Sequence, residues 1–432
     1  MSKQKKVIYL HLVIAILCLP IHYYMGEVLK LALLPYVLLM VFSKNPNFLP
    51  ALIIHTTPGN TVSLVILLAC IWLTLINYNK LKKYKITSIL NSLLVLLPVF
   101  LYFLYDNVFI KNIGFSFSLQ YLGFYLSFFA FFYGILLAEK INKNHWYPIL
   151  LIIFLMPIIM FIPLPQKITI KLFWLALPLA ITVLLANFLG NKLKVKRNLK
   201  VWSILFIICI GIPHGLKFTP ILSAIIAILI LLFYIKGYKV FFNALTKPRI
   251  GVIVTILIIL AISNISDYSP EENFKDYKIV DLDSLIAYIK FKTFDDRAVL
   301  WKGGWDFLIN SSYVWPTGKV PSYSYITSGG SEIDEIEFGI HNLGLELMRN
   351  YGIIIGTYLS VIYLIIITKL KIVFKTDTNS FLLVFSATLI GLGIGVATVG
   401  QAVLMPAFSF TFLGLIGICF GIGQKKVFRH VR

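Results

Sequence analysis

The sequence has little charge. Asp, Glu, Lys and Arg fill 13% of its 432 positions, whereas hydrophobic residues fill 59% and the mean hydropathy is +0.88. About 25% of an ordinary soluble domain is charged, so this composition excludes that class and predicts a polytopic membrane protein. Continuous apolar windows long enough to cross a bilayer indicate helices, since a closed barrel requires alternating residues. The windows fall at 86–105, 117–138, 147–163, 168–189, 201–216, 218–235, 250–265 and 350–368.

Cysteine is also scarce. The four cysteines lie inside apolar windows with no close neighbour, at positions 18, 70, 209 and 419. This spacing predicts neither disulfides nor a metal site, and we interpret these residues as small buried hydrophobes. The basic start and apolar core of residues 1–20 also fit a signal peptide. No small-x-small cleavage site follows, so we expect an uncleaved first span.

Acidic residues number 18 against 39 basic ones, which gives a net charge of +21. The basic residues stand in clusters between apolar windows, as in cytoplasmic loops under the positive-inside rule, so no nucleic-acid partner is expected. Two windows separate successive clusters from Lys80 onward, which predicts cytoplasmic termini and ten spans after residue 80. The N-terminal part leaves a total of 12 or 14 spans, and we favour an all-α membrane protein with about 12. The clusters are Lys3 to Lys6, Lys80 to Lys85, Lys140 to Lys143, Lys192 to Lys200, Lys236 to Arg249, Lys369 to Lys375 and Lys425 to Arg432.

Acidic residues concentrate in one segment, since 13 of the 18 lie within 266–339. We therefore divide a single integral membrane domain into helices with short loops (1–265), a large extracytoplasmic loop with short helices (266–339) and C-terminal helices (340–432). A loop this long in a compact protein is usually functional.

A helical spacing is present inside this loop. Arg297, Trp301, Trp305 and Leu308 stand at i, i+4, i+8 and i+11, which predicts a helix with a cation and two indoles on one face. The indoles fit either packing onto the membrane surface or stacking against sugars. Arg297 is one of six arginines against 33 lysines. Its planar fork suits phosphate or carboxylate, and a salt bridge to a neighbouring loop acid is the alternative.

Polar residues open the segment FGIHNLGLELMRNYGIIIG, where the loop returns to the membrane. A helix there places His341, Leu345 and Arg349 on one face and Asn342 and Glu346 on the adjacent face. A histidine at such an interface is either structural or catalytic. Glu346 and Arg349 also fit a simple i, i+3 pair.

The order of these features resembles the O-antigen ligase and polymerase superfamily of bacterial membrane glycosyltransferases. The matching elements are Arg297-x-x-x-Trp301, then Gly318, then His341-Asn342, then Glu346 and the glycine-containing run YGIIIG. They cover about residues 295–356, and the many-span topology with one large late loop matches over the whole chain. The resemblance implies a GT-C type fold without cofactor or metal. It also implies transfer of a glycan from undecaprenyl pyrophosphate to an acceptor hydroxyl on the outer face of the bacterial plasma (inner) membrane.

The resemblance assigns His341 as the base that deprotonates the acceptor and Arg297 as a partner of the pyrophosphate. Both roles fit the chemistry of an imidazole near its ordinary pKa and of a fixed guanidinium. The family's second arginine is missing here, where the sequence reads IPHGLKFTPILSAI. We expect Lys217, or His214, to supply that cation, although Lys217 also fits an interfacial anchor. Further substrate-binding candidates are Arg349, Asn342, Trp301 and Trp305.

These assignments favour a repeat-unit polymerase for O-antigen or capsule polysaccharide. A ligase that moves the finished glycan to lipid A-core or protein is the first alternative, and a flippase for lipid-linked oligosaccharide or a structural assembly partner are others. The loop has no DxD motif, Walker loop or HExxH motif, which disfavours a nucleotide-sugar enzyme and a zinc hydrolase. Expected partners are undecaprenyl-pyrophosphate-linked oligosaccharides, membrane lipids and a chain-length regulator.

Overall fold

The computed structural model describes residues 2–18, 32–56, 61–110, 115–155, 157, 169–189, 193–211, 218–236, 342–376, 379–399 and 406–430, together with Trp301, Trp305 and Leu308. Within these residues the chain is almost entirely helical and contains no strand, which confirms the all-α prediction for this part. The elements are α1 (Lys3–Leu17), α4 (Leu34–Phe42), η1 (Pro46–Phe48), α5 (Leu49–His55), α6 (Thr61–Ile76), α7 (Tyr78–Lys82), α8 (Thr87–Tyr105), η2 (Asp106–Ile110), α9 (Phe115–Ala138), α10 (Lys143–Leu155), α11 (Thr169–Leu189), α12 (Arg197–Phe206), η6 (Ile207–Gly211), α13 (Phe218–Ile235), α18 (Leu343–Thr368), α19 (Lys371–Lys375), α20 (Ser380–Val399) and α21 (Pro406–His430).

Several apolar windows coincide with single helices. The windows 86–105, 117–138, 168–189 and 218–235 agree closely with α8, α9, α11 and α13. The window 250–265 and most of the acidic loop lie outside the described residues. All four cysteines are free. Cys70 and Cys419 are buried, as predicted, whereas Cys18 is half-buried and Cys209 is exposed, so the prediction of burial is wrong for these two.

The described helices include five stretches that are long and apolar enough to cross a membrane, which is consistent with a multi-pass membrane protein. They are Thr87–Ile110, Leu172–Leu189, Leu343–Lys375, Ser380–Ala397 and Phe408–Val427. Shorter apolar helices lie at Val65–Ile76, Leu122–Ala138, Asn144–Leu155 and Thr219–Ile235.

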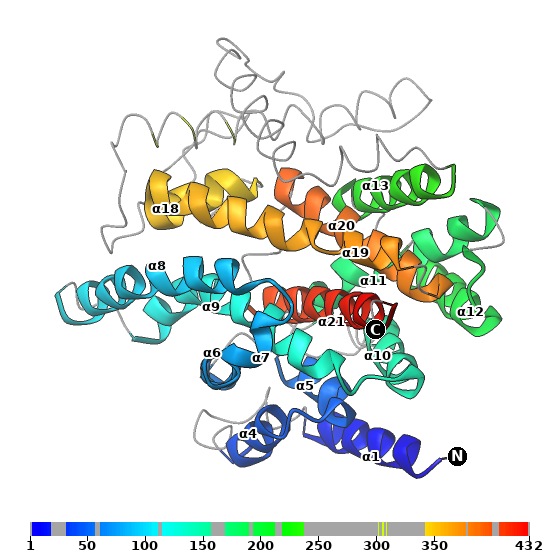
Figure 1. The fold of residues 1–432 in the computed structure, drawn as a ribbon, viewed down its shortest axis with the longest axis horizontal. Helices are drawn as coiled ribbons and strands as arrows, with labels where there is room; N and C mark the ends of the chain where they lie inside the picture. The colour runs from blue at the N-terminus through cyan, green and yellow to red at the C-terminus, as the bar shows by residue number, and fades with distance from the viewer. Residues whose placement is uncertain are drawn as a thin grey trace.

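Helices distant in sequence pack against each other along their length. Helix α21 packs on α9 and α20 packs on α13 (Figure 1). Glycine permits this close approach: a Cβ added to Gly417 would overlap the carbonyl oxygen of Phe131, and one added to Gly391 would overlap that of Ser223. Small residues at such interfaces allow the backbone contact that stabilises helix pairs in membranes, where burial of apolar surface contributes little.

A polar cluster joins the turn before α8 to the ends of α9 and α21. Lys83 forms an ion pair with Glu139, and the hydroxyl of Tyr84 donates a hydrogen bond of 3.0 Å to the same carboxylate. Lys425 donates to the backbone oxygen of Glu139 at 2.9 Å.

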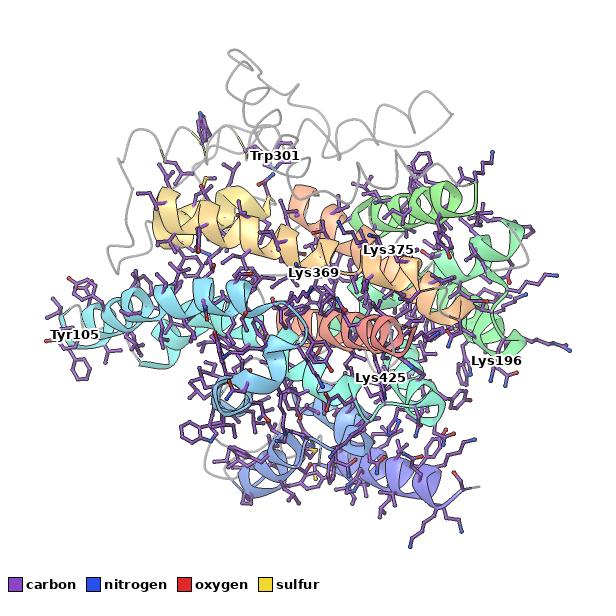
Figure 2. The ribbon with its side chains drawn as sticks, in the orientation of Figure 1. Tyr105, Lys196, Trp301, Lys369, Lys375 and Lys425 are labelled. Atoms are coloured by element: carbon purple, nitrogen blue, oxygen red, sulfur yellow. The ribbon has the colours of Figure 1, made fainter. Side chains whose placement is uncertain are left out.

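In Figure 2, Lys425 and Lys196 lie in the right half of the view, whereas Tyr105 lies at the left edge.

Candidate functional site

The candidate site is the first part of α18. Asn342 has an extended backbone, and its side-chain oxygen accepts a hydrogen bond of 3.1 Å from the backbone N–H of Leu345. Asn342 therefore caps the helix and satisfies one of the amides that a helix N-terminus leaves without an intrahelical partner. Asn342 directly precedes the first helical residue, and its backbone oxygen accepts a hydrogen bond of 2.9 Å from the N–H of Glu346.

Glu346 and Arg349 form a buried ion pair inside this first part. Arg349 Nη2 lies 3.0 Å from Glu346 Oε2, and the side chains are 15% and 1% exposed, respectively. The structure thus has the i, i+3 pair that the sequence left as one alternative. Glu346 also lies in the first turn, where the helix dipole favours a negative charge. Because Glu346 compensates the charge of Arg349, the pair presents a neutral unit rather than an isolated cation.

A sharp turn at Gly352 divides α18. The φ and ψ angles of Gly352 are 79° and 160°, a combination that is essentially restricted to glycine. A Cβ added to Gly356 would overlap the backbone of Leu347 and Met348. Residues eight apart in a straight helix are separated by about 12 Å, so the two segments must fold against each other. The two glycines of YGIIIG therefore serve different purposes, one at the turn and one at the contact.

Aromatic packing holds this turn against α8 and α9. The ring of Tyr351 is buried and meets the rings of Phe100 and Phe103 at centroid distances of 5.3 and 6.5 Å. Phe100 in turn stacks on Tyr125 of α9 at 4.0 Å. The hydroxyl of Tyr125 donates to the carbonyl of Leu93 at 2.8 Å, so this polar end is satisfied. The position of the turn is thus set by long-range contacts.

Outside the Glu346–Arg349 pair, two buried polar atoms of α18 and the acidic loop have no hydrogen-bond partner among the described residues. They are Oδ1 of Asn350 and Nε1 of Trp301. Asn350 is 8% exposed. Leaving such an atom unsatisfied costs about 1–3 kcal/mol, so each requires an explanation. Asn350 lies four residues after Glu346 and two before the turn at Gly352.

The loop residues that the structure describes agree with the predicted spacing. Trp301, Trp305 and Leu308 are helical, Leu308 is fully buried and both tryptophans are half-buried. Figure 2 shows Trp301 on the side of α18 opposite to α8. Both the membrane-packing and the sugar-stacking interpretations of the indoles remain compatible with partial burial.

The predicted site residues divide into two groups. Asn342 and Arg349 are described at the cap and in the second turn of α18, and Trp301 and Trp305 are described as helical residues of the acidic loop. His341, Arg297, Lys217 and His214 lie outside the described residues, so their roles stay predictions. The sequence interpretation missed Asn350, although its position at i+4 from Glu346 marks it as a further polar residue in an apolar helix.

No protein-family model matches this chain, and no curated protein matches it in sequence. The resemblance to the ligase and polymerase superfamily therefore rests on the order of the motifs.

Proposed function

We propose that the protein is a polysaccharide polymerase of the GT-C type in the bacterial plasma membrane. It transfers a glycan from undecaprenyl pyrophosphate to a non-reducing-end hydroxyl of another lipid-linked repeat unit. The observation that carries this proposal is the opening of α18, where the asparagine of the His341-Asn342 motif caps a helix that continues through the glycine turn at Gly352. Asn342, Glu346 and the two glycines of the motif each have a specific structural task.

The proposed reaction needs a base and a site for the leaving group. His341 accepts the proton of the acceptor hydroxyl, and the oxygen attacks the anomeric carbon of the donor sugar. The bond from that carbon to the pyrophosphate oxygen breaks, and undecaprenyl pyrophosphate leaves with the electron pair. Arg297, with Lys217 as the second cation, stabilises the charge on this leaving group.

The helix terminus supports the choice of His341 as the base. His341 directly precedes the cap of α18 in sequence, and the N-terminal end of a helix carries a partial positive charge. A positive potential disfavours the imidazolium form, and a neutral imidazole is the form that accepts a proton.

The proposed topology has about 12 spans, cytoplasmic termini and the 266–339 loop outside the cell. Five long apolar helices and the separation of lysine clusters from the acidic loop support it. In Figure 2, Lys196 and Lys425 also lie away from Tyr105 along the long axis of the molecule.

The test is polymer formation by purified protein supplied with lipid-linked repeat units extracted from the source strain, with product length resolved on a gel. We expect the wild-type protein to produce a ladder, and His341→Ala and Arg297→Ala to produce none while remaining folded. His430→Ala and Arg429→Ala, which change the same residue types at the end of α21, serve as matched controls and should retain the ladder.

Other outcomes discriminate among the alternatives. Ladders from both His341→Ala and Arg297→Ala would reject the proposed mechanism and fit a structural assembly partner. A wild-type protein that makes no ladder but glycosylates a lipid A-core acceptor is a ligase. One that only moves the lipid-linked substrate across vesicles is a flippase.

A further inference from the structure

Asn350 is a buried amide in an apolar helix, near the ion pair of Glu346 and Arg349. Its residue is 8% exposed, and its Oδ1 has no hydrogen-bond partner among the described residues. Glu346, one turn earlier on α18, pairs at 3.0 Å with Arg349, the residue directly before Asn350. The carbonyl oxygen of Asn350 is therefore a hydrogen-bond acceptor in a region of low dielectric, where an unmet acceptor is expensive.

The chemistry of this oxygen restricts what can bind to it. A carbonyl oxygen needs a donor, and the oxygens of a pyrophosphate diester are acceptors only, so they would repel it. Sugar hydroxyls and N-acetyl N–H groups are donors. Of the two parts of a lipid-linked oligosaccharide, only the glycan supplies a donor for Oδ1 of Asn350.

We infer that Asn350 is a glycan-binding residue, whose Oδ1 accepts a hydrogen bond from a sugar hydroxyl or N-acetyl N–H of the substrate. This inference rests on the proposed function and extends it, because it assigns the beginning of α18 to the sugar part of the substrate. The neutral Glu346–Arg349 pair beside it fits the same assignment, since a compensated arginine is a poor phosphate ligand.

A structural role for the amide makes the opposite prediction about stability. Replacement of an unsatisfied buried amide by an apolar side chain of similar size removes a desolvation cost, so Asn350→Leu should keep or raise the melting temperature. If Asn350 holds the fold together, the same change lowers it. Asn187 in α11 offers a matched control, because its Oδ1 is also buried without a partner while its Nδ2 donates to the carbonyl of Val183 at 2.8 Å.

The experiment uses the full-length protein in detergent and two probes. The first probe is the repeat-unit oligosaccharide released by mild acid from the lipid-linked extract, and the second is undecaprenyl pyrophosphate without sugar. Binding of each is measured by titration calorimetry for the wild type, Asn350→Leu, Asn350→Gln and Asn187→Leu. We expect Asn350→Leu to weaken oligosaccharide binding about tenfold, as loss of one hydrogen bond predicts, without changing binding of the sugar-free lipid. Asn350→Gln, which keeps the amide, should recover part of the affinity, and Asn187→Leu should bind both probes like the wild type.

Several results would overturn the inference. Unchanged oligosaccharide binding by Asn350→Leu would do so, and so would a weaker affinity for the sugar-free lipid alone. If Asn350→Leu does not fold, the oligosaccharide titration is repeated with the smaller Asn350→Ala variant, and wild-type affinity in that variant rejects the inference. The ladder assay separates the two proposals, because a wild-type protein that binds oligosaccharide through Asn350 but builds no ladder contradicts only the polymerase function.

Discussion

Arg349 and Glu346 form an ion pair of 3.0 Å in the buried first part of α18. The Glu346 side chain is almost completely inaccessible, whereas the Arg349 side chain is 15% exposed. This asymmetry matters because removal of either partner leaves the other charge in a different environment. Because the two charges compensate each other, neither contributes an isolated charge to the site.

We predict that Arg349→Gln destabilises the protein more than Glu346→Gln. Loss of Arg349 leaves a buried carboxylate without its cation, which costs about 3–5 kcal/mol, whereas loss of Glu346 leaves a cation with access to solvent. The double variant should be more stable than Arg349→Gln alone, since both charges are then absent. Thermal unfolding of the three variants in one detergent measures the order. Equal melting temperatures for Arg349→Gln and the wild type would contradict a stabilising role for the pair.

A second prediction concerns the turn at Gly352. The backbone of Gly352 has φ 79° and ψ 160°, so Gly352→Ala forces a side chain into a region that only glycine occupies readily. We expect a loss of about 1–3 kcal/mol in the free energy of unfolding, together with faster proteolysis near the turn. Ile354→Ala is the control, because Ile354 is 47% exposed and lies just beyond the turn.

The comparison of these two variants is decisive for the turn. If Gly352→Ala is as stable and as resistant to protease as Ile354→Ala, the turn does not require glycine. A loss confined to Gly352→Ala would show that the strain arises from the backbone.

The sequence predicts the helices of this protein better than the way in which they bend. Apolar windows such as 168–189 and 218–235 reproduce α11 and α13 because uninterrupted hydrophobicity in a bilayer permits few alternatives to a helix. The spacing of Glu346 and Arg349 likewise anticipates their pairing, since i, i+3 neighbours on a helix always lie within reach.

The turn at Gly352 was not predictable in the same way. Glycine occurs both inside transmembrane helices and at turns, and two glycines four residues apart also fit a straight helix packed against a neighbour. What selects the turn is the anchoring of Tyr351 between Phe100 and Phe103, more than 240 positions earlier in the chain. The unpartnered oxygen of Asn350 was invisible for a related reason, because hydrogen-bond satisfaction depends on what surrounds a residue in space.

The third prediction concerns pH and the cluster around Glu139. Partial burial acts to raise the pKa of this carboxyl, but the hydrogen bonds from Lys83 and Tyr84, together with the charges of Lys83 and Lys80, outweigh burial and hold the pKa below its ordinary value. The folded pKa is thus below the unfolded one, so the cluster stabilises the fold above the unfolded pKa of about 4.3, and this contribution disappears as the pH falls through the folded pKa. Because Lys83 and Glu139 are 49% and 39% exposed, the contribution should be at most about 1 kcal/mol.

Melting temperatures of the wild type and of Glu139→Gln between pH 7 and pH 3 measure this contribution. The wild type should be slightly more stable at pH 7, and the two curves should converge in acid, where the carboxyl of the wild type is protonated. Lys83→Gln should reproduce the loss at pH 7, whereas Lys82→Gln, which removes the same charge one residue earlier and stands over the ring of Tyr78, should not. A difference between the wild type and Glu139→Gln that stays constant from pH 7 to pH 3 would assign the effect of Glu139 to packing rather than to its charge.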